Sequence, residues 1–365
     1  MTKKQAKHRR RMRQLRAWLL LITMVVLVAL AVVGVVSLVM PRYRYAPLDS
    51  HTSEDLGYER TFDKKIVNIA LFGIDTREPD SFSGLSDCIM IVSVNTETKQ
   101  VKLLSIMRDS LVRIEKNGKT SFGKINAVYQ RGAAQSIRAI NRNFGTDISD
   151  YVTVNFFGLA KIIDALGGVD ITLTDEEIAD LGPKRPTINF YIGEICAGLG
   201  VDPKDYYLTK SGTQHVNGVQ AVAYSRIRYV RNTWGGSDDF GRTDRQRYVL
   251  EQLFTAAKTM PKSRCLSLIK TALPCIETSL TYGDMASLAV NVLLKQPSFA
   301  QMRIPRYEFL MDPPHGKWGS AVYYDLDYAA AVIKAVIYDD MTIDAFEEIR
   351  SVEKNDWYAK ANGKG

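Results

Sequence analysis

Acidic and arginine side chains stand where three apolar runs of the chain begin or end. The first run leads into Asp75 and Arg77. The second begins directly after Asp87, and the third ends at Arg108. Strand ends gather at one edge of an open α/β sheet, which is where ligands usually bind. We therefore expect these side chains to form one site; the alternative, for each taken singly, is an ordinary turn residue.

Two further arginine-rich stretches lie close together in the chain. Arg226 and Arg228 are two residues apart, so on a strand they would point to the same face. Arg242, Arg245 and Gln246 have the i, i+3, i+4 spacing of one helix face, and the same row continues into apolar positions. A helix N-terminus favours anions and arginine forks favour phosphate, so the pattern predicts an anion pocket. The alternative is internal salt bridging of these arginines to nearby acids, which are Asp238, Asp239 and Asp244.

Several arginines combined with two carboxylates suit a polyphosphate ligand. The carboxylates would hold a hard cation such as Mg²⁺, which bridges phosphate oxygens. Phosphoryl transfer then needs mainly positioning and charge stabilisation. The chain has no G-x-S-x-G, no G-x-x-x-x-G-K-[ST] and no H-E-x-x-H motif. Direct transfer to a bound acceptor hydroxyl is therefore favoured over a covalent enzyme intermediate.

The elements that must carry these residues follow from hydrophobic periodicity. The apolar runs 66–72, 88–94 and 101–107 predict strands, and the short connection between the last two predicts a hairpin. Strands mixed with helices predict a layered α/β fold with a central sheet. The remaining expectations are helices over 127–144, 159–166 and 243–260, a strand over 169–174, and long loops over 180–215.

The charge distribution excludes a nucleic-acid-binding protein. The chain has 365 residues, of which 46% are hydrophobic and 24% charged, as in ordinary globular proteins. Its net charge is +8, but residues 1–17 carry eight basic and no acidic side chains, so the remainder is neutral overall. A basic tail on a neutral body offers no basic face for a nucleic acid.

Residues 18–40 predict a membrane anchor. These 23 residues carry no charge, and a helix of that length spans the roughly 30 Å hydrocarbon layer of a bilayer. The basic residues before the segment place the N-terminus in the cytoplasm and the rest of the chain outside. The alternative is a cleaved signal peptide. The expected organisation is a basic tail (1–17), the anchor (18–40), a linker (41–64), a catalytic domain (65–262) and an unassigned part (263–365).

The cysteines would then lie in a compartment where disulfides persist. Cys88 lies inside an apolar run, which favours a buried thiol. We expect one disulfide among Cys196, Cys265 and Cys275. The sequence does not decide which two of them pair.

The order of short motifs resembles the LytR-CpsA-Psr family over roughly residues 66–260. Each motif is weak alone, but seven in the same order are hard to produce by chance. After the basic-flanked anchor come G-x-D-x-R, S-D-x-I-M, S-I-x-R-D, K-I-N-A, D-A-L-G-G-V-D, R-x-R and D-F-G-R-x-[DE]-R-Q-R. They occupy residues 73–77, 86–90, 105–109, 124–127, 164–170, 226–228 and 239–247.

The resemblance implies a three-layer α-β-α sandwich with a central mixed sheet and a hydrophobic pocket for a polyprenyl chain. It also implies a bacterial phosphotransferase anchored in the cell membrane, with its catalytic domain outside the cytoplasm. Such an enzyme moves a teichoic acid, capsule or similar glycopolymer from an undecaprenyl pyrophosphate carrier to peptidoglycan. The product of that transfer is a phosphodiester link.

By motif position, the resemblance assigns roles to individual residues. Asp75 and Asp87 would carry Mg²⁺ or Mn²⁺ on the pyrophosphate, and Gln246 would assist. Asp239 or another nearby acid would deprotonate the acceptor hydroxyl. The side chains that would bind pyrophosphate oxygens are Arg77, Arg108, Lys124, Arg226, Arg228, Arg242 and Arg245.

The sequence departs from the family pattern at three positions: Met107 replaces a common Pro, Leu85 a common Arg, and Cys88 a common Thr. None of them removes an acid or an arginine of the assigned site, although the Leu85 position could lack one phosphate contact.

Two other functions fit the same residues. One is a pyrophosphatase that hydrolyses the lipid pyrophosphate with water as acceptor. The other is a non-catalytic protein that only holds polyprenyl phosphate. Turnover separates the two enzymes from the binding protein. The identity of the product separates the transferase from the pyrophosphatase.

Overall fold

The computed structural model describes residues 42–50, 52–58, 63, 65–116, 118–289, 298–306, 309–311 and 319–341. The anchor expected over residues 18–40 lies outside them. Within the described residues, no helix combines the length and the apolar character that a bilayer span needs.

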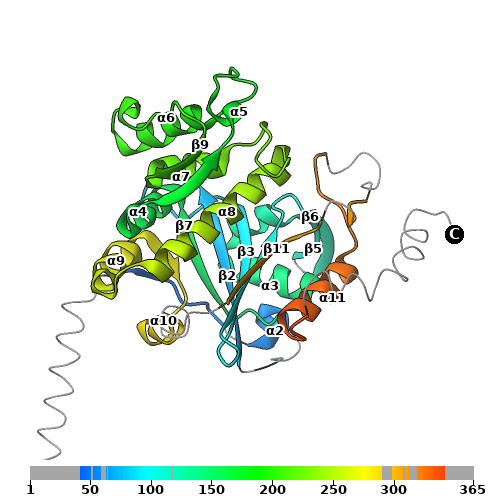
Figure 1. Cartoon of the computed structure of the whole chain (residues 1–365). Helices are drawn as coiled ribbons and strands as arrows, with labels where there is room; N and C mark the ends of the chain where they lie inside the picture. Colours follow the sequence, from blue (N-terminus) through cyan, green and yellow to red (C-terminus); the bar gives the residue numbers. More distant parts are fainter. Residues whose placement is uncertain are drawn as a thin grey trace, which may run out of the picture. The chain divides into compact units, whose positions relative to one another are not determined.

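A seven-stranded mixed sheet forms the centre of the domain that begins at Tyr43 (Figure 1). Its strand order is β1-β10-β7-β2-β3-β4-β11. The strands β2, β3 and β4 are antiparallel neighbours, while β7 runs parallel to β2 and β11 runs parallel to β4. The bounds are β1 (Arg44–Tyr45), β2 (Ile66–Asp75), β3 (Leu85–Asn95), β4 (Gln100–Ile106), β7 (Asp150–Asn155), β10 (Ile276–Thr278) and β11 (Ser298–Ile304).

Helices cover both faces of this sheet (Figure 1). On one face α2 (Ser53–Leu56), α3 (Ala133–Phe144) and α11 (Leu326–Ile337) pack on the strands in one hydrophobic cluster. On the other face lie α4 (Phe156–Leu166), α7 (Gly218–Arg226) and α8 (Asp238–Thr259). Two small hairpins stand outside the sheet, β5 (Leu111–Lys116) with β6 (Lys119–Lys124) and β8 (Val169–Leu173) with β9 (Gly212–Val216). The expected layered α/β fold with a central mixed sheet is confirmed.

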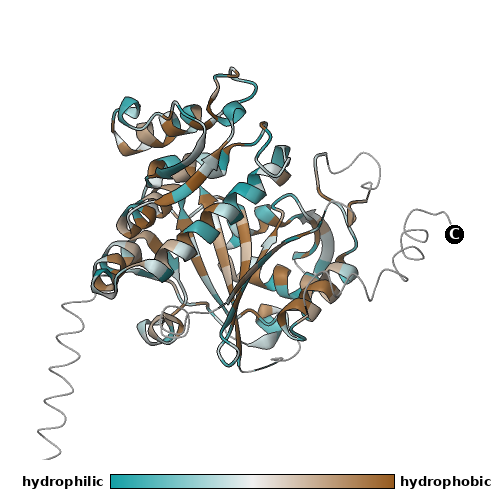
Figure 2. Ribbon diagram, in the orientation of Figure 1, coloured by the Kyte–Doolittle hydropathy of each residue, from teal (hydrophilic) through white to brown (hydrophobic). Residues whose placement is uncertain are grey.

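The two faces of β2 serve different purposes. Ala70, Phe72 and Ile74 join the hydrophobic cluster under α3 and α11. The alternate residues Leu71 and Gly73 line a cavity on the other face. Because side chains alternate along a strand, Asp75 falls on the cavity face as well. Figure 2 shows that the central strands are mostly hydrophobic. Because helices cover both faces of the sheet, apolar residues follow one another almost without interruption along these strands.

Several expected elements are confirmed and others are corrected. The three strands and the β3–β4 hairpin form as expected. Residues 180–215 are not all loop, because they contain α6 (Ile188–Leu199) and the strand β9. The helix expected over 127–144 is a 3-10 helix (Ile125–Arg131) and then α3, and β8 pairs with β9 outside the central sheet. The helix α8 starts five residues before the expected position.

The segments outside the expected catalytic domain also pack on it. Within the expected linker 41–64, β1 pairs with β10, and Leu48 and Leu56 are buried in the first hydrophobic cluster. After residue 262 the chain contributes β10 and β11 to the central sheet and α11 to one face. Other elements there are α9 (Cys265–Ala272) and α10 (Tyr282–Ala289). All four cysteines are free thiols in the structure, so the expected disulfide does not form there.

Candidate functional site

A β-bulge brings Asp87 to the same face of the sheet as Asp75. Gly73 of β2 pairs with Cys88 of β3, but its neighbour Ile74 pairs with Ser86, so Asp87 is the extra residue. The bulge lets Ser86 turn to the first hydrophobic core while Asp87 turns to the other face. Gly73 is required here, because a Cβ at this position would stand 2.7 Å from Cβ of Cys88.

Around these two acids the fold assembles one group of charged side chains, which we term the carboxylate–arginine cluster. Its members come from the ends of β2, β3, β4 and β6, from α6, and from the α7–α8 region. They are Asp75, Asp87, Arg108, Asp109, Lys124, Glu194, Arg226, Arg228, Asp239 and Arg242. The expectation that the charged strand ends and the arginines around α8 converge is therefore confirmed.

The centre of the cluster is a buried square of two acids and two arginines. Nη1 of Arg108 lies 2.7 Å from Oδ2 of Asp87, and Nη1 of Arg242 lies 3.4 Å from the same oxygen. Nη2 of Arg242 lies 2.6 Å from Oδ1 of Asp239. Nε of Arg108 lies 3.4 Å from that Oδ1. The four side chains are between 9% and 16% exposed, so their charges are poorly screened by water.

A second part of the cluster surrounds Asp75. Arg226 lies 3.7 Å from Oδ2 of Asp75 and 3.0 Å from Oε2 of Glu194. Its guanidinium stacks over the rings of Phe156 at 4.7 Å and Tyr191 at 5.1 Å. These rings hold the guanidinium in place while leaving its hydrogens for acidic partners.

The remaining expected residues lie at the edge of the cluster. Arg77 is 73% exposed and pairs with Glu194 at 3.1 Å. Lys124 is 30% exposed and pairs with Asp109 at 3.1 Å. Arg228 approaches Asp239 at 3.6 Å. Arg226 and Arg228 do not lie together on a strand, because Arg226 is the last residue of α7. Both side chains still reach the cluster.

Three guanidinium groups of the cluster have hydrogens to offer. Nε of Arg108, Arg228 and Arg242 is buried and makes no hydrogen bond within the part of the chain that the structure describes. Buried donors are normally hydrogen-bonded, and unmade bonds are costly. Nε of Arg108 and Nε of Arg228 lie 3.4 and 3.6 Å from Oδ1 of Asp239, so donors left without a hydrogen bond in the cluster favour an oxygen-rich anion as a further partner.

Burial changes the acid–base behaviour of two members. It raises the pKa of Asp75, an effect that Arg226 opposes and that Asp87 reinforces by repulsion. Burial likewise lowers the pKa of the Arg242 guanidinium, against the opposing attraction of Asp239. In each case the effect of burial outweighs the attraction of the nearest opposite charge.

Arg245 does not join the cluster. It is fully buried, and its Nε donates to Oε1 of Glu177 at 2.7 Å. Its Nη1 and Nη2 donate to the carbonyls of Ile227 and Val230 at 3.0 and 2.8 Å. The expected phosphate contact of Arg245 is therefore corrected: in this conformation its nitrogens are occupied in the core. It instead fixes the backbone that carries Arg226 and Arg228.

An apolar cavity of about 170 Å³ lies beside the cluster. Leu71, Val152 and Val154 line it from the sheet, and Leu159, Leu250 and Leu253 line it from the helices. The second hydrophobic cluster, which holds α4, α6 and α7 together, contains no residue of the central sheet among the described residues. The cavity is the space left between that helical layer and the sheet.

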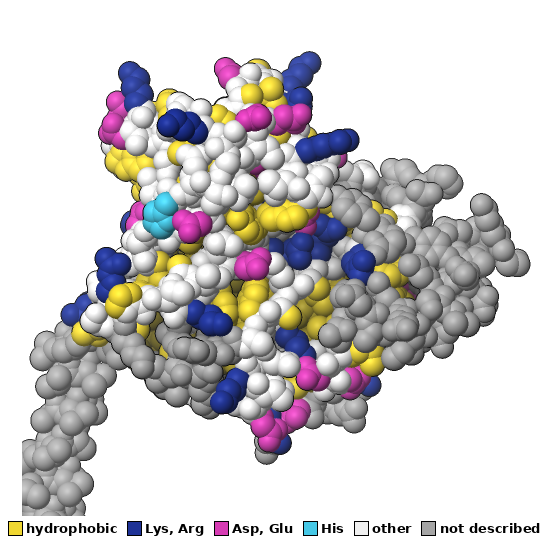
Figure 3. All heavy atoms as spheres, in the orientation of Figure 1, with side chains coloured by type: hydrophobic (Ala, Val, Ile, Leu, Met, Phe, Trp, Pro, Cys, Tyr) yellow, Lys and Arg dark blue, Asp and Glu magenta, His cyan; other side chains and the backbone are white. Residues whose placement is uncertain are grey.

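The cavity and the carboxylate–arginine cluster are adjacent, because residues next to cluster members in the chain line the cavity. Gly73 and Cys88 line the cavity, and the cluster acids Asp75 and Asp87 lie two residues and one residue away. Gln246 lines the cavity one helical turn after Arg242, and Phe156 lines it beneath Arg226. The row predicted on α8, polar first and then apolar, therefore runs from the cluster into the cavity. Figure 3 shows basic and hydrophobic side chains next to one another on the face that bears α8.

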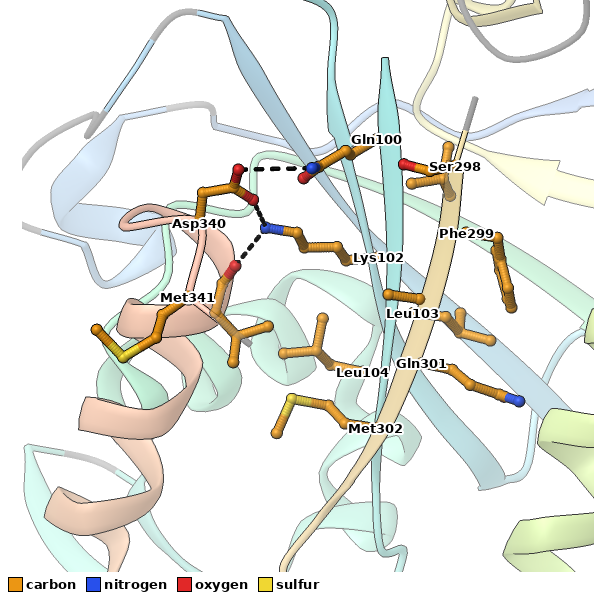
Figure 4. Close-up of a pocket in the computed structure, with 13 residues that line it drawn as sticks. Gln100, Lys102, Leu103, Leu104, Ser298, Phe299, Gln301, Met302, Asp340 and Met341 are labelled. Carbon is orange, nitrogen blue, oxygen red and sulfur yellow. Dashed lines mark hydrogen bonds and ion pairs between the residues drawn. The ribbon is translucent and has the colours of Figure 1, made fainter. Parts of the chain in front are cut away.

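A separate cavity of about 300 Å³ lies along β4 and β11 beside α11 (Figure 4). Nζ of Lys102 there is bound by Asp340 and by the carbonyl of Val336, both at 2.6 Å. Gln100 also reaches Asp340. These polar groups connect the sheet to the end of α11, and the lining includes neither a member of the carboxylate–arginine cluster nor a residue next to one in the chain. We therefore place the candidate site at the smaller cavity.

The two acids Asp75 and Asp87 suit a divalent cation. Asp87 raises the pKa of Asp75, which is the repulsion a bound cation would relieve. Within the described residues, no group of three acid, histidine or cysteine side chains forms a complete metal cage. Two carboxylates with phosphate oxygens completing the shell is a common arrangement for Mg²⁺.

Glu194 is a site residue that the sequence did not reveal. It pairs with both Arg77 and Arg226 from α6, a helix within the segment expected to be loop. A signal was present, since Ile188, Ile192 and Ile195 have the spacing of one helix face.

Several known proteins have similar sequences. "Biofilm regulatory protein A" of Streptococcus mutans is 31% identical over 52% of this chain and 44% of its own length. The Bacillus subtilis polyisoprenyl-teichoic acid–peptidoglycan teichoic acid transferase TagV is 30% identical over 52% and 43%. Enterococcus faecalis TagU, also named a polyisoprenyl-teichoic acid–peptidoglycan teichoic acid transferase, is 28% identical over 62% of this chain and 66% of its own length. The matched part of the chain thus spans less than two thirds of each relative.

Solved structures have the same fold. A Streptococcus agalactiae protein superimposes with a TM-score of 0.58 at 22% identity, covering 79% of this chain and 91% of that one. Bacillus subtilis TagV superimposes with a TM-score of 0.54 at 24% identity, covering 76% and 98%. The family model matches residues 45–332, which is most of the chain. This protein therefore belongs to the LytR_cpsA_psr family.

Proposed function

We propose that this chain transfers a glycopolymer from a polyprenyl pyrophosphate carrier to peptidoglycan through a phosphodiester bond. The observation that carries the proposal is the apolar cavity that ends at the carboxylate–arginine cluster. Such a site holds a lipid chain at one end and a pyrophosphate at the other. Relatives support it: TagV and TagU are named teichoic acid transferases, and TagT has been solved with octaprenyl pyrophosphate bound.

The cavity would take the polyprenyl chain. Its lining from Val154, Leu250 and Leu253 is apolar, and burying an apolar chain away from water is favourable. Because Gln246 and Phe156 connect the cavity to the arginines, the pyrophosphate would stand at Arg242 and Arg226. Arg108 and Arg228 would donate to its oxygens through the nitrogens that lack hydrogen-bond partners among the described residues.

Asp75 and Asp87 would hold Mg²⁺, which would neutralise charge that builds up on the phosphate oxygens. An oxygen of the acceptor hydroxyl attacks phosphorus and forms a new P–O bond. The anhydride P–O bond breaks, and polyprenyl phosphate leaves. The proton of the hydroxyl passes to a carboxylate of the cluster, for which Asp239 is our candidate because its carboxylate lies at the centre of the cluster, beside Arg108, Arg228 and Arg242. Those arginines stabilise the negative charge of the transferring group.

The location of the protein is part of the same proposal. Residues 18–40 would anchor it in the bacterial cell membrane, with residues 1–17 in the cytoplasm and the described domain outside. The lipid carrier would then reach the cavity from the bilayer.

Product analysis tests the proposal. The full chain is incubated with a synthetic polyprenyl-pyrophosphate oligosaccharide, Mg²⁺ and peptidoglycan fragments, and the products are identified by mass spectrometry. We expect an oligosaccharide–phosphate–peptidoglycan adduct that is lost in Asp75→Ala and Arg242→Ala. Free sugar phosphate without the adduct would indicate a pyrophosphatase. Retained lipid without turnover would indicate a binding protein.

A further inference from the structure

A third concave surface lies on the outer side of α8, away from the apolar cavity. It encloses about 310 Å³ and is lined by Trp234, Asp244, Arg247, Tyr248, Glu251 and Gln301. We term these six residues the Trp234 pocket. None of them belongs to the carboxylate–arginine cluster, so the proposed reaction leaves the pocket without a role.

Trp234 is an exposed aromatic side chain held in a fixed position. It is 54% exposed, and its ring meets that of Tyr248 edge to face with centroids 4.9 Å apart. Its loop is organised by the buried Asn232, whose Oδ1 accepts hydrogen bonds from the backbone of Trp234 at 3.0 Å and Gly236 at 2.8 Å. Gly235 supplies a φ of +80° to this turn. A large apolar ring kept in water by a rigid loop indicates a binding surface.

The one arginine of the pocket is already paired with a carboxylate. Oδ1 of Asp244 lies 2.7 Å from both Arg247 and Arg303, the latter from outside the pocket. Glu251 accepts a hydrogen bond from the Gln301 amide at 2.7 Å. Because two carboxylates stand beside this single paired guanidinium, the pocket suits an uncharged ligand better than a phosphate.

Two polar atoms of the lining complete the ligand's description. Nε of Arg247 and Oε1 of Gln301 are buried and make no hydrogen bond within the described part of the chain. One is a donor and the other an acceptor. A hydroxyl group is the partner that can satisfy both kinds of atom, since it accepts and donates. The aromatic ring supplies a flat face for the apolar side of a sugar.

We infer that the Trp234 pocket is a saccharide-binding subsite, taking a pyranose ring of the acceptor or of the transferred polymer. The inference rests on the proposed function for the choice of saccharides. The chain itself connects the pocket to the reaction: the loop with Trp234 lies between the cluster residues Arg228 and Asp239, and Arg247 follows Arg242 on α8. The pocket and the cluster therefore share one loop and one helix.

A titration with two soluble probes tests the inference. The full chain is titrated calorimetrically with lipid-free sugar phosphate of the donor and, separately, with disaccharide-peptide fragments of peptidoglycan. Binding of the fragments assigns the pocket to the acceptor, and binding of the sugar phosphate assigns it to the donor. Trp234→Ala should weaken that binding by about tenfold or more, because aromatic side chains that a ligand covers carry much of the binding energy.

Two variants make the result specific. Trp234→Phe keeps an aromatic face and should restore most of the binding. Tyr207→Ala removes an aromatic side chain that is 45% exposed elsewhere and should bind like the unaltered chain. Thermal unfolding of each variant shows whether it is folded.

Failure of the inference differs from failure of the proposed function. The subsite is overturned if neither probe binds. It is also overturned if the unaltered chain and Trp234→Ala bind the probe equally. In the transfer assay, the subsite predicts a raised KM for the saccharide that binds, with a smaller change in kcat. If no adduct forms with any variant, the transfer reaction is wrong, while the titration still reports on the pocket.

Discussion

Asp87 and Arg242 meet across the site although they are 155 positions apart: Oδ2 of Asp87 on β3 lies 3.4 Å from Nη1 of Arg242 on α8. Both side chains are about nine-tenths buried. The contact joins the bulged strand, which carries an expected metal ligand, to the start of α8, which carries an expected phosphate contact. Together with the pair formed by Arg108 and Asp239, it connects the charged strand ends to α8.

Arg242 and Arg245 occupy the same helix but should respond differently to removal. Arg242→Ala removes a charge that faces the ligand, so transfer should fall by about 10²-fold or more. Arg245→Ala leaves the buried Glu177 unpaired and should lower the free energy of unfolding by about 3–5 kcal/mol. Turnover and urea unfolding of both variants measure the two effects. The reverse assignment would place Arg245 in the site and contradict the structure.

Asp75 should control the metal requirement. If it holds Mg²⁺, Asp75→Asn should raise the Mg²⁺ concentration for half-maximal turnover by about tenfold or more. Asp80→Asn, which changes an exposed acid nearby, is the matched control and should leave that concentration unchanged. An unchanged requirement in Asp75→Asn would remove this residue from the metal site.

The cavity should select for the lipid. Val154→Phe introduces a ring into a space of about 170 Å³, so the polyprenyl substrate should lose access. We expect its KM to rise by about tenfold or more, because several buried methylene groups of the lipid would be displaced. Val201→Phe, at a position that is 39% exposed, provides a substitution of the same kind outside the cavity. Equal KM values for both variants would show that the lipid binds elsewhere.

His215 provides a test away from the site. Its Nδ1 lies 2.8 Å from Oδ1 of Asp170, and this hydrogen bond, with a second to the Gly167 carbonyl, raises the pKa of His215. The charged form is favoured in the folded state, so its stabilising effect is complete at low pH. It is lost as the pH rises through the raised pKa. In an NMR titration, Asp170→Asn should lower the pKa of His215; no change would rule out this pairing.

Hydrophobic periodicity was enough to predict the three strands β2, β3 and β4 of the central sheet, but not β1, β7, β10 and β11. The runs before Asp75, after Asp87 and before Arg108 form adjacent strands because each is apolar on both faces. Their charged ends converge as expected. The bulge at Asp87 could not be predicted, because a strand shifted by one residue has the same composition.

The roles of individual arginines were harder to predict than their location. The spacing of Arg242, Arg245 and Gln246 places them on neighbouring positions of α8. The sequence does not show that Arg245 pairs with the buried Glu177 while Arg242 faces the cluster. The helix with Glu194 was missed because Gly and Pro around it suggested loops. In both cases a contact distant in sequence decides what the side chain does.

A structure of the full chain with a short-chain polyprenyl pyrophosphate bound tests the central claim most directly. The account predicts the prenyl chain in the cavity lined by Val154, Leu250 and Leu253, and the pyrophosphate within hydrogen-bond distance of Arg242 and Arg108. It also predicts a cation between Asp75 and Asp87 when Mg²⁺ is present. A lipid bound outside this cavity, or a pyrophosphate that touches none of these arginines, would contradict it.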